Sequence, residues 1–132
     1  MAALPSQEII MIITKILTSE LFVAACLLLI FWAMQVLAQI LFKYGSEGTS
    51  MRWWLGFAAG NVFGASSILL LMKLYTRMNP NLALALGAGG AFLFSQFVLS
   101  WVFGSRLMVS QWIGLLLITA GMTLASLDLS HQ

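Results

Sequence analysis

Four long stretches of apolar residues alternate with short polar segments along the chain. Each stretch is about as long as the roughly 20 apolar residues that an α-helix needs to cross the hydrocarbon core of a bilayer. The pattern therefore predicts an all-α membrane protein, with a four-helix transmembrane domain at 21–127 and a short polar tail at 128–132. The predicted transmembrane helices cover residues 21–42, 53–72, 81–103 and 107–127.

Residues 1–20 have a different pattern. Apolar residues recur at helical spacing between Ile9 and Leu17, while Glu8 and Lys15 lie on the other side. Such a segment is too short to cross a bilayer, so we expect an amphipathic N-terminal helix lying in the membrane interface. The alternative is a simple extension of the first transmembrane helix. The segment lacks the basic start of a signal peptide, and we expect it to be retained.

Composition supports the membrane assignment. Of 132 residues, 61% are hydrophobic and 8% are charged, whereas about a quarter of a soluble domain is charged. The net charge of +2 is too small to indicate a nucleic-acid partner. One cysteine, Cys26, and one histidine, His131, provide neither a disulfide framework nor a zinc cluster. We expect no metal and no cofactor.

The first predicted helix carries a polar stripe. Gln35, Gln39 and Lys43 follow one another at intervals of four residues, which places them on one helix face. An unpartnered amide in hydrocarbon is costly, so the stripe should face protein or a water-filled cavity. Asn61 and Gln96 are further amides in the second and third helices. The alternatives are that the amides join helices by hydrogen bonds and that Lys43 extends to the headgroups.

Small residues recur at spacings that allow close helix packing in lipid. The second helix has two overlapping G-x-x-x-G units, the third has a stripe of small residues four apart, and the fourth has two glycines one heptad apart. The residues are Gly56, Gly60 and Gly64, then Gly87 and Ala91, then Gly114 and Gly121.

Several segments resemble a known family. The runs from Trp101 to Leu107 and from Ile113 to Gly121, with Asn79-Pro80 before the third helix, are similar to the small multidrug resistance family. That family is the four-helix branch of the drug/metabolite transporter superfamily. The segment 37–43 also resembles the Gly-Gln-x-x-x-Lys of aminoarabinose-lipid flippase subunits. The resemblance covers about residues 31–127.

The chain departs from this family at its central residue. Gln35 takes the place of the membrane-embedded glutamate that binds cation and proton in the multidrug exporters. None of the four predicted helices contains Asp or Glu, and Leu84 and a glycine-rich run replace the expected aromatic pair. An amide does not release a proton. The resemblance therefore implies a transporter without the usual proton-coupling carboxylate.

Three functions are compatible with these features. The first is a transporter or flippase in the bacterial inner membrane, working as a homodimer or with a related subunit. Gln35, Gln39, Asn61 and Gln96 would line its pathway, and Lys43 would contact a phosphate or carboxylate near the mouth. The second is a non-transporting subunit of a larger membrane complex. The third, a cation exporter, would need an acid from a partner chain. The absence of paired acids and of Ser-His or Cys-His pairs argues against an enzyme.

Overall fold

The structure, a computed structural model, describes residues 6–126 except the side chains of 6–9, 12, 13, 16 and 17. Its elements are α1 (Ser6–Ser46), α2 (Ser50–Tyr75), α3 (Pro80–Val102) and α4 (Val109–Ser126). All four are long and apolar enough to cross a membrane, with Thr18–Ser46 as the candidate span of α1. This confirms the predicted four-helix membrane architecture. The polar tail 128–132 lies outside the described residues.

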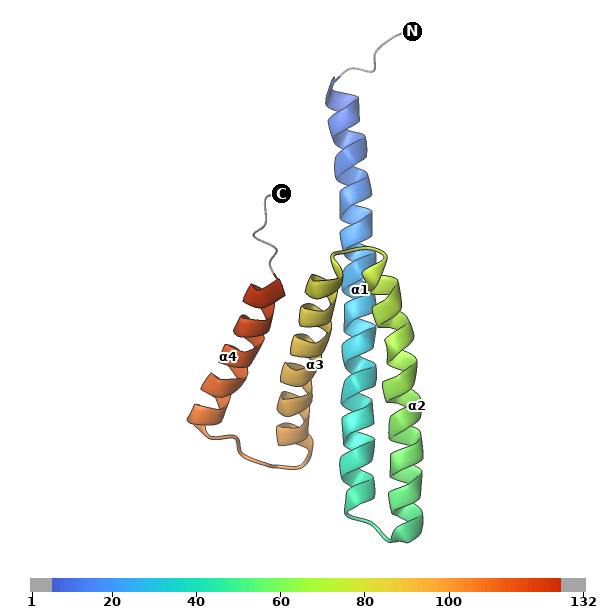
Figure 1. Cartoon of the computed structure of the whole chain (residues 1–132), viewed down its shortest axis with the longest axis vertical. Coiled ribbons are helices and arrows are strands. Elements are labelled where there is room, and N and C mark those ends of the chain that lie inside the picture. Colours follow the sequence, from blue (N-terminus) through green and yellow to red (C-terminus); the bar gives the residue numbers. More distant parts are fainter. Residues whose placement is uncertain (1–5, 127–132) are drawn as a thin grey trace.

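The separate N-terminal helix expected over residues 1–20 is not seen. Residues 6–20 instead continue into the first span, so α1 is one helix of 41 residues. The sequence contains neither glycine nor proline between Pro5 and Gly45, and no residue that strongly disfavours a helix interrupts it. At 1.5 Å per residue, α1 is about 60 Å long, twice the thickness of the hydrocarbon core. It projects beyond the other helices (Figure 1).

An antiparallel hairpin of α1 and α2 forms one half of the molecule (Figure 1). A Cβ atom added to Gly56 would lie 2.6 Å from the Cα of Gly45 and 2.7 Å from the carbonyl oxygen of Leu41. One added to Gly60 would lie 2.4 Å from the Phe42 ring. Glycine is therefore required where the two helices approach most closely.

The third helix packs on α1 through Trp32. Its Nε1 donates to the carbonyl oxygens of Leu86, at 3.1 Å, and of Gly87, at 3.2 Å. The indole also stacks on Phe94, with ring centroids 5.0 Å apart. A Cβ on Gly90 would lie 2.3 Å from the indole, so the ring fits only because this residue is glycine.

The fourth helix packs only on α3 among the described residues (Figure 1). A Cβ on Gly114 or on Gly121 would meet no atom of the described part of the chain within 4 Å. These two glycines, expected to pack against another helix, therefore lie on an open surface of this chain. Gly104, in the connection before α4, has a φ of 65°, which glycine adopts at little cost.

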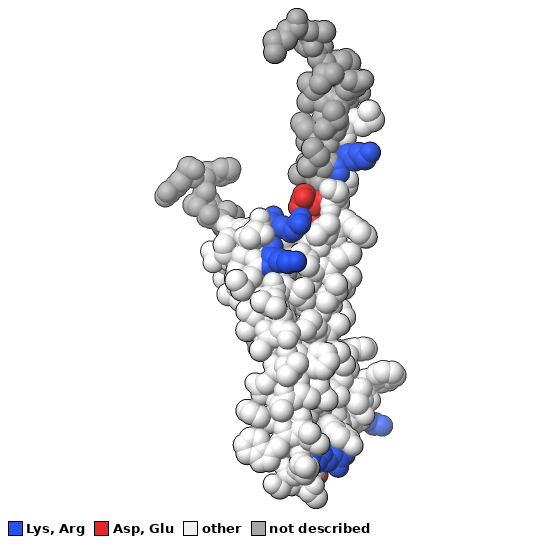
Figure 2. Space-filling model, turned by 90° about the vertical axis from the view of Figure 1, so that its right-hand side faces the viewer, with Lys and Arg blue, Asp and Glu red and all other residues white. Residues whose placement is uncertain are grey.

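Charged side chains lie towards the ends of the bundle. On the face in Figure 2, lysine and arginine side chains gather above and below a wide uncharged region. Large apolar side chains are exposed on all four helices; Trp101, for example, is 80% exposed. An uncharged belt between charged ends is the surface that a lipid bilayer covers.

Candidate functional site

A cavity of about 360 Å³ lies between α1 and α3. Three glutamine side chains line it: Gln35 and Gln39 from α1, and Gln96 from α3. We call it the amide cavity. The remaining lining is Ser95 with the apolar residues Phe31, Ala88, Ala91, Phe92 and Leu99.

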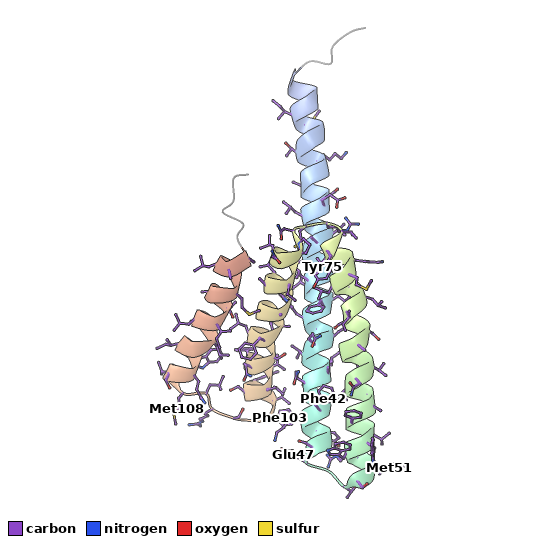
Figure 3. All side chains as sticks on the ribbon, viewed as in Figure 1. Phe42, Glu47, Met51, Tyr75, Phe103 and Met108 are labelled. Atoms are coloured by element: carbon purple, nitrogen blue, oxygen red, sulfur yellow. The ribbon has the colours of Figure 1, made fainter. Side chains whose placement is uncertain are left out.

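A second cavity, of about 710 Å³, shares Gln39, Gln96 and Leu99 with the first. We call it the mouth cavity, because it leads to the α1–α2 turn. Its other lining residues include Glu47, Phe42 and Phe103, which lie at the same end of the molecule (Figure 3). The shared residues make the two cavities neighbouring parts of one polar path along α1.

The amide of Gln35 joins α1 to α2. Its Nε2 donates to the Oγ of Ser67 at 2.8 Å, and that hydroxyl donates to the carbonyl oxygen of Gly64 at 2.7 Å. Ser67 is fully buried. Gln35 therefore has a structural partner, and its carbonyl oxygen accepts no hydrogen bond from the residues that the structure describes. Interhelical bonds of this kind contribute about 0.6–2 kcal/mol in lipid.

Gln39 and Gln96 differ from Gln35, since neither side chain makes a hydrogen bond within the part of the chain that the structure describes. Each amide has two N–H donors and a carbonyl acceptor to satisfy. Both lie in helices predicted to cross the membrane, where an unpartnered amide is unfavourable. These two side chains therefore need water, a ligand or another chain as a partner.

Lys43 lies at the mouth cavity but is not a free cation. Its Nζ is 2.6 Å from Oε1 of Glu47, and both side chains are about half exposed, at 47% and 53%. The same Nζ lies 6.0 Å from the centroid of the Phe103 ring. The opposite charges of Lys43 and Glu47 cancel, so this site attracts an anion less strongly than Lys43 alone would.

Asn61 lies apart from the other predicted site residues. Its side chain is exposed and donates to the carbonyl oxygen of Phe57, one turn earlier, at 2.8 Å. The preceding residue, Gly60, faces α1, and consecutive helical residues are rotated by about 100°. Asn61 is therefore directed away from the α1–α2 contact, and it lines neither the amide cavity nor the mouth cavity.

Sequence reasoning missed three kinds of residue at this site. In the sequence, Ser67 is only a small polar residue of the second helix. Its hydrogen bond to Gln35 depends on how α1 and α2 align, which the sequence does not give. Ser95 follows Ala91 by four residues, so in the sequence it extends the stripe of small residues and is not distinguished from a packing residue. The aromatic walls, Phe31 and Phe92, resemble the many other apolar residues of their helices.

Within residues 6–126, no three His, Cys, Asp or Glu side chains come together as a metal site would require. Searches of family models, of curated proteins and of solved structures find no match to this chain. The resemblance to small multidrug resistance proteins therefore rests on the sequence motifs alone.

Proposed function

We propose that this protein is a small membrane transporter or flippase of the drug/metabolite transporter type, acting as a dimer in a bacterial inner membrane. Its substrate would be an amphipathic molecule with an uncharged polar head. The observation that carries this proposal is the convergence of Gln35, Gln39 and Gln96 on one cavity, with two of the three amides unpartnered among the described residues.

The chemistry of the cavity favours this substrate class. An amide both donates and accepts hydrogen bonds and keeps its neutral form, so it suits hydroxyl, amide or carbonyl groups. Phe31 and Phe92 offer apolar surface beside these amides. The ion pair of Lys43 and Glu47 favours a neutral head over the phosphate or carboxylate that Lys43 alone would attract.

The dimer is proposed because the site is incomplete in one chain. The amide cavity is lined by residues of α1 and α3 alone. Hydrogen-bonding groups that face lipid are unfavourable, so a second copy or a related subunit would close the open side. The open glycines of α4 would allow a close approach by that partner.

The test uses vesicles that contain the purified protein and a fluorescent lipid. One probe is an NBD-labelled glucosyl lipid with an uncharged head, and the other is anionic NBD-phosphatidylglycerol. Addition of dithionite to the outside measures how fast each probe crosses the bilayer. We expect the wild type to accelerate the uncharged probe, Gln39→Leu and Gln96→Leu to abolish this, and Asn61→Leu to retain it.

Two results would contradict the proposal. One is transfer of the uncharged probe at the rate of protein-free vesicles. The other is equal loss of transfer in Gln39→Leu and Asn61→Leu, because only Gln39 lines the cavity.

A second candidate is a non-transporting subunit of a larger membrane complex. The long projecting part of α1 and the weakly packed α4 favour it, because each offers surface to another protein (Figure 1). Mild detergent extraction and native mass spectrometry distinguish the two. A homodimer supports the transporter, and a stoichiometric complex with unrelated proteins supports the subunit.

A further inference from the structure

The two ends of the bundle are packed differently. At the α2–α3 turn, Leu74 and Ala83 are fully buried and Ala24 nearly so. Between α1 and α3, the mouth cavity lies at the opposite end and the amide cavity near the middle of the helices, whereas a cavity of about 350 Å³ at the first end lies between α3 and α4. Figure 1 shows α1, α3 and α4 converging towards the first end, which we call the closed end, and spreading towards the second. Four partly buried residues pack on the core of the closed end: Leu27, Leu28, Leu71 and Met78.

An ion pair spans the closed end. Arg77 bonds through Nη1 to Oε2 of Glu20. Glu20 belongs to α1, and Arg77 lies in the turn three residues before Pro80, where α3 begins. The pair therefore ties α1 to the turn between α2 and α3, and through this turn to the residue where α3 begins. Both side chains are partly exposed, at 56% and 33%, so water has access when the pair separates.

Trp32 joins α1 to α3 between the closed end and the mouth cavity, beside the amide cavity. Trp32 bonds to the carbonyl oxygens of Leu86 and Gly87, about one turn beyond the buried Ala83. Gly89 and Gly90 follow in α3, and each glycine lowers helix stability by about 1 kcal/mol relative to alanine. A Cβ on Gly90 would lie 2.3 Å from the indole, so α3 meets Trp32 through its backbone at this point and has no side chain there to prevent a tilt of the whole helix.

We propose that the Glu20–Arg77 ion pair is the gate of the closed end, and that α3 rocks about Trp32. Separation of the pair lets the start of α3 move away from α1 while its end, with Gln96, moves towards Gln39 and closes the cavities. This inference rests on the proposed transporter function, since a carrier exposes one site to each side of the membrane in turn. An exposed ion pair contributes up to about 1 kcal/mol. Losing this one therefore changes the ratio of molecules with the closed end open to molecules with it shut by about fivefold.

The test measures distances between paired spin labels in lipid nanodiscs, in the full chain with Cys26→Ala. One pair, Leu21→Cys with Asn81→Cys, reports on the closed end. The other, Thr49→Cys with Arg106→Cys, reports on the mouth. All four positions are exposed. Dilution with unlabelled protein removes distances between copies.

We expect Arg77→Gln to increase, by about fivefold, the fraction of molecules with the longer distance between the labels at the closed end. In the same fraction of molecules, the distance between the labels at the mouth should become shorter. Lys73→Gln is the matched control, since it removes a cation from the same end outside the pair. The charge swap Glu20→Arg with Arg77→Glu should restore the wild-type distribution, which also excludes misfolding as the cause.

The gate is refuted if Arg77→Gln changes neither distance, or if it changes the closed end without the mouth. It is also refuted if the charge swap behaves like Arg77→Gln. The measurement uses no substrate, so coupled distance changes alongside failed lipid transfer would contradict the transporter and not the moving gate.

Discussion

The substitution Gly56→Ala tests how closely the backbones of α1 and α2 approach. The new methyl group would lie 2.6 Å from the Cα of Gly45 and 2.7 Å from the carbonyl oxygen of Leu41. Ordinary contact begins at 3.4 Å, so the overlap with Gly45 is about 0.8 Å. Both neighbours are backbone atoms that cannot rotate aside. The two helices must therefore separate to accept the methyl group.

The matched control is Gly64→Ala, two turns further along the same helix. Its methyl group would lie 3.8 Å from the Cβ of Ala38, which is ordinary contact. Both substitutions gain the same helix propensity, about 1 kcal/mol, and this gain cancels when they are compared. The remaining difference is the cost of overpacking, about 1–3 kcal/mol in favour of Gly64→Ala.

The assay is reversible unfolding in mixed micelles, with increasing mole fraction of sodium dodecyl sulfate and helix content measured by circular dichroism. We expect Gly56→Ala to unfold at a clearly lower mole fraction than Gly64→Ala. If the two free energies of unfolding agree within about 0.5 kcal/mol, the backbones are not in contact at Gly56 and the hairpin packs differently.

Three further outcomes follow from the contacts. Gly90→Ala should displace the indole of Trp32, whose ring lies 2.3 Å from the new Cβ position, and should change the tryptophan signal in near-ultraviolet circular dichroism; an unchanged spectrum would contradict this packing. Ser67→Ala should cost about 0.6–2 kcal/mol in the unfolding assay because Gln35 loses its partner, whereas the same cost in Ser66→Ala would show that the loss is not specific. Gly121→Leu should not destabilise the monomer and should raise its stability by about 1 kcal/mol through helix propensity, since no described atom lies within 4 Å of the new Cβ; a large loss of stability at dilution to monomer would show that α4 is packed.

Hydrophobic length predicted the helices well. The observed α2, α3 and α4 lie within a few residues of the predicted segments, because each is bounded by glycine, proline or polar residues. The start of α1 was not predictable in this way. Residues 6–20 are more polar than a transmembrane segment, and this change in polarity suggested that the helix begins after them. Every one of these residues is nevertheless compatible with a helix, so the backbone of α1 continues through them.

For the candidate site, the sequence predicted which residues share a face of one helix, but not how the faces of different helices meet. The spacing of Gln35 and Gln39 placed them on one side of α1, and both line the amide cavity. Asn61 was grouped with them by residue type, but the rotation of α2 is fixed by Gly56 and Gly60 against α1 and turns Asn61 outwards. A pattern of small residues also does not identify their partner. Gly60 packs within the chain, whereas Gly121 lies on an open surface.

The uninterrupted length of α1 has a consequence for how movement inside the bilayer could be detected. A helix without a break behaves as a stiff rod, so a small tilt of the buried portion displaces the far tip by a larger amount. Ile10 lies near that tip and is 60% exposed, about 12 Å before Thr18, the start of the candidate span. A fluorophore attached at this position would serve as an amplified external readout of tilting, without any label within the lipid.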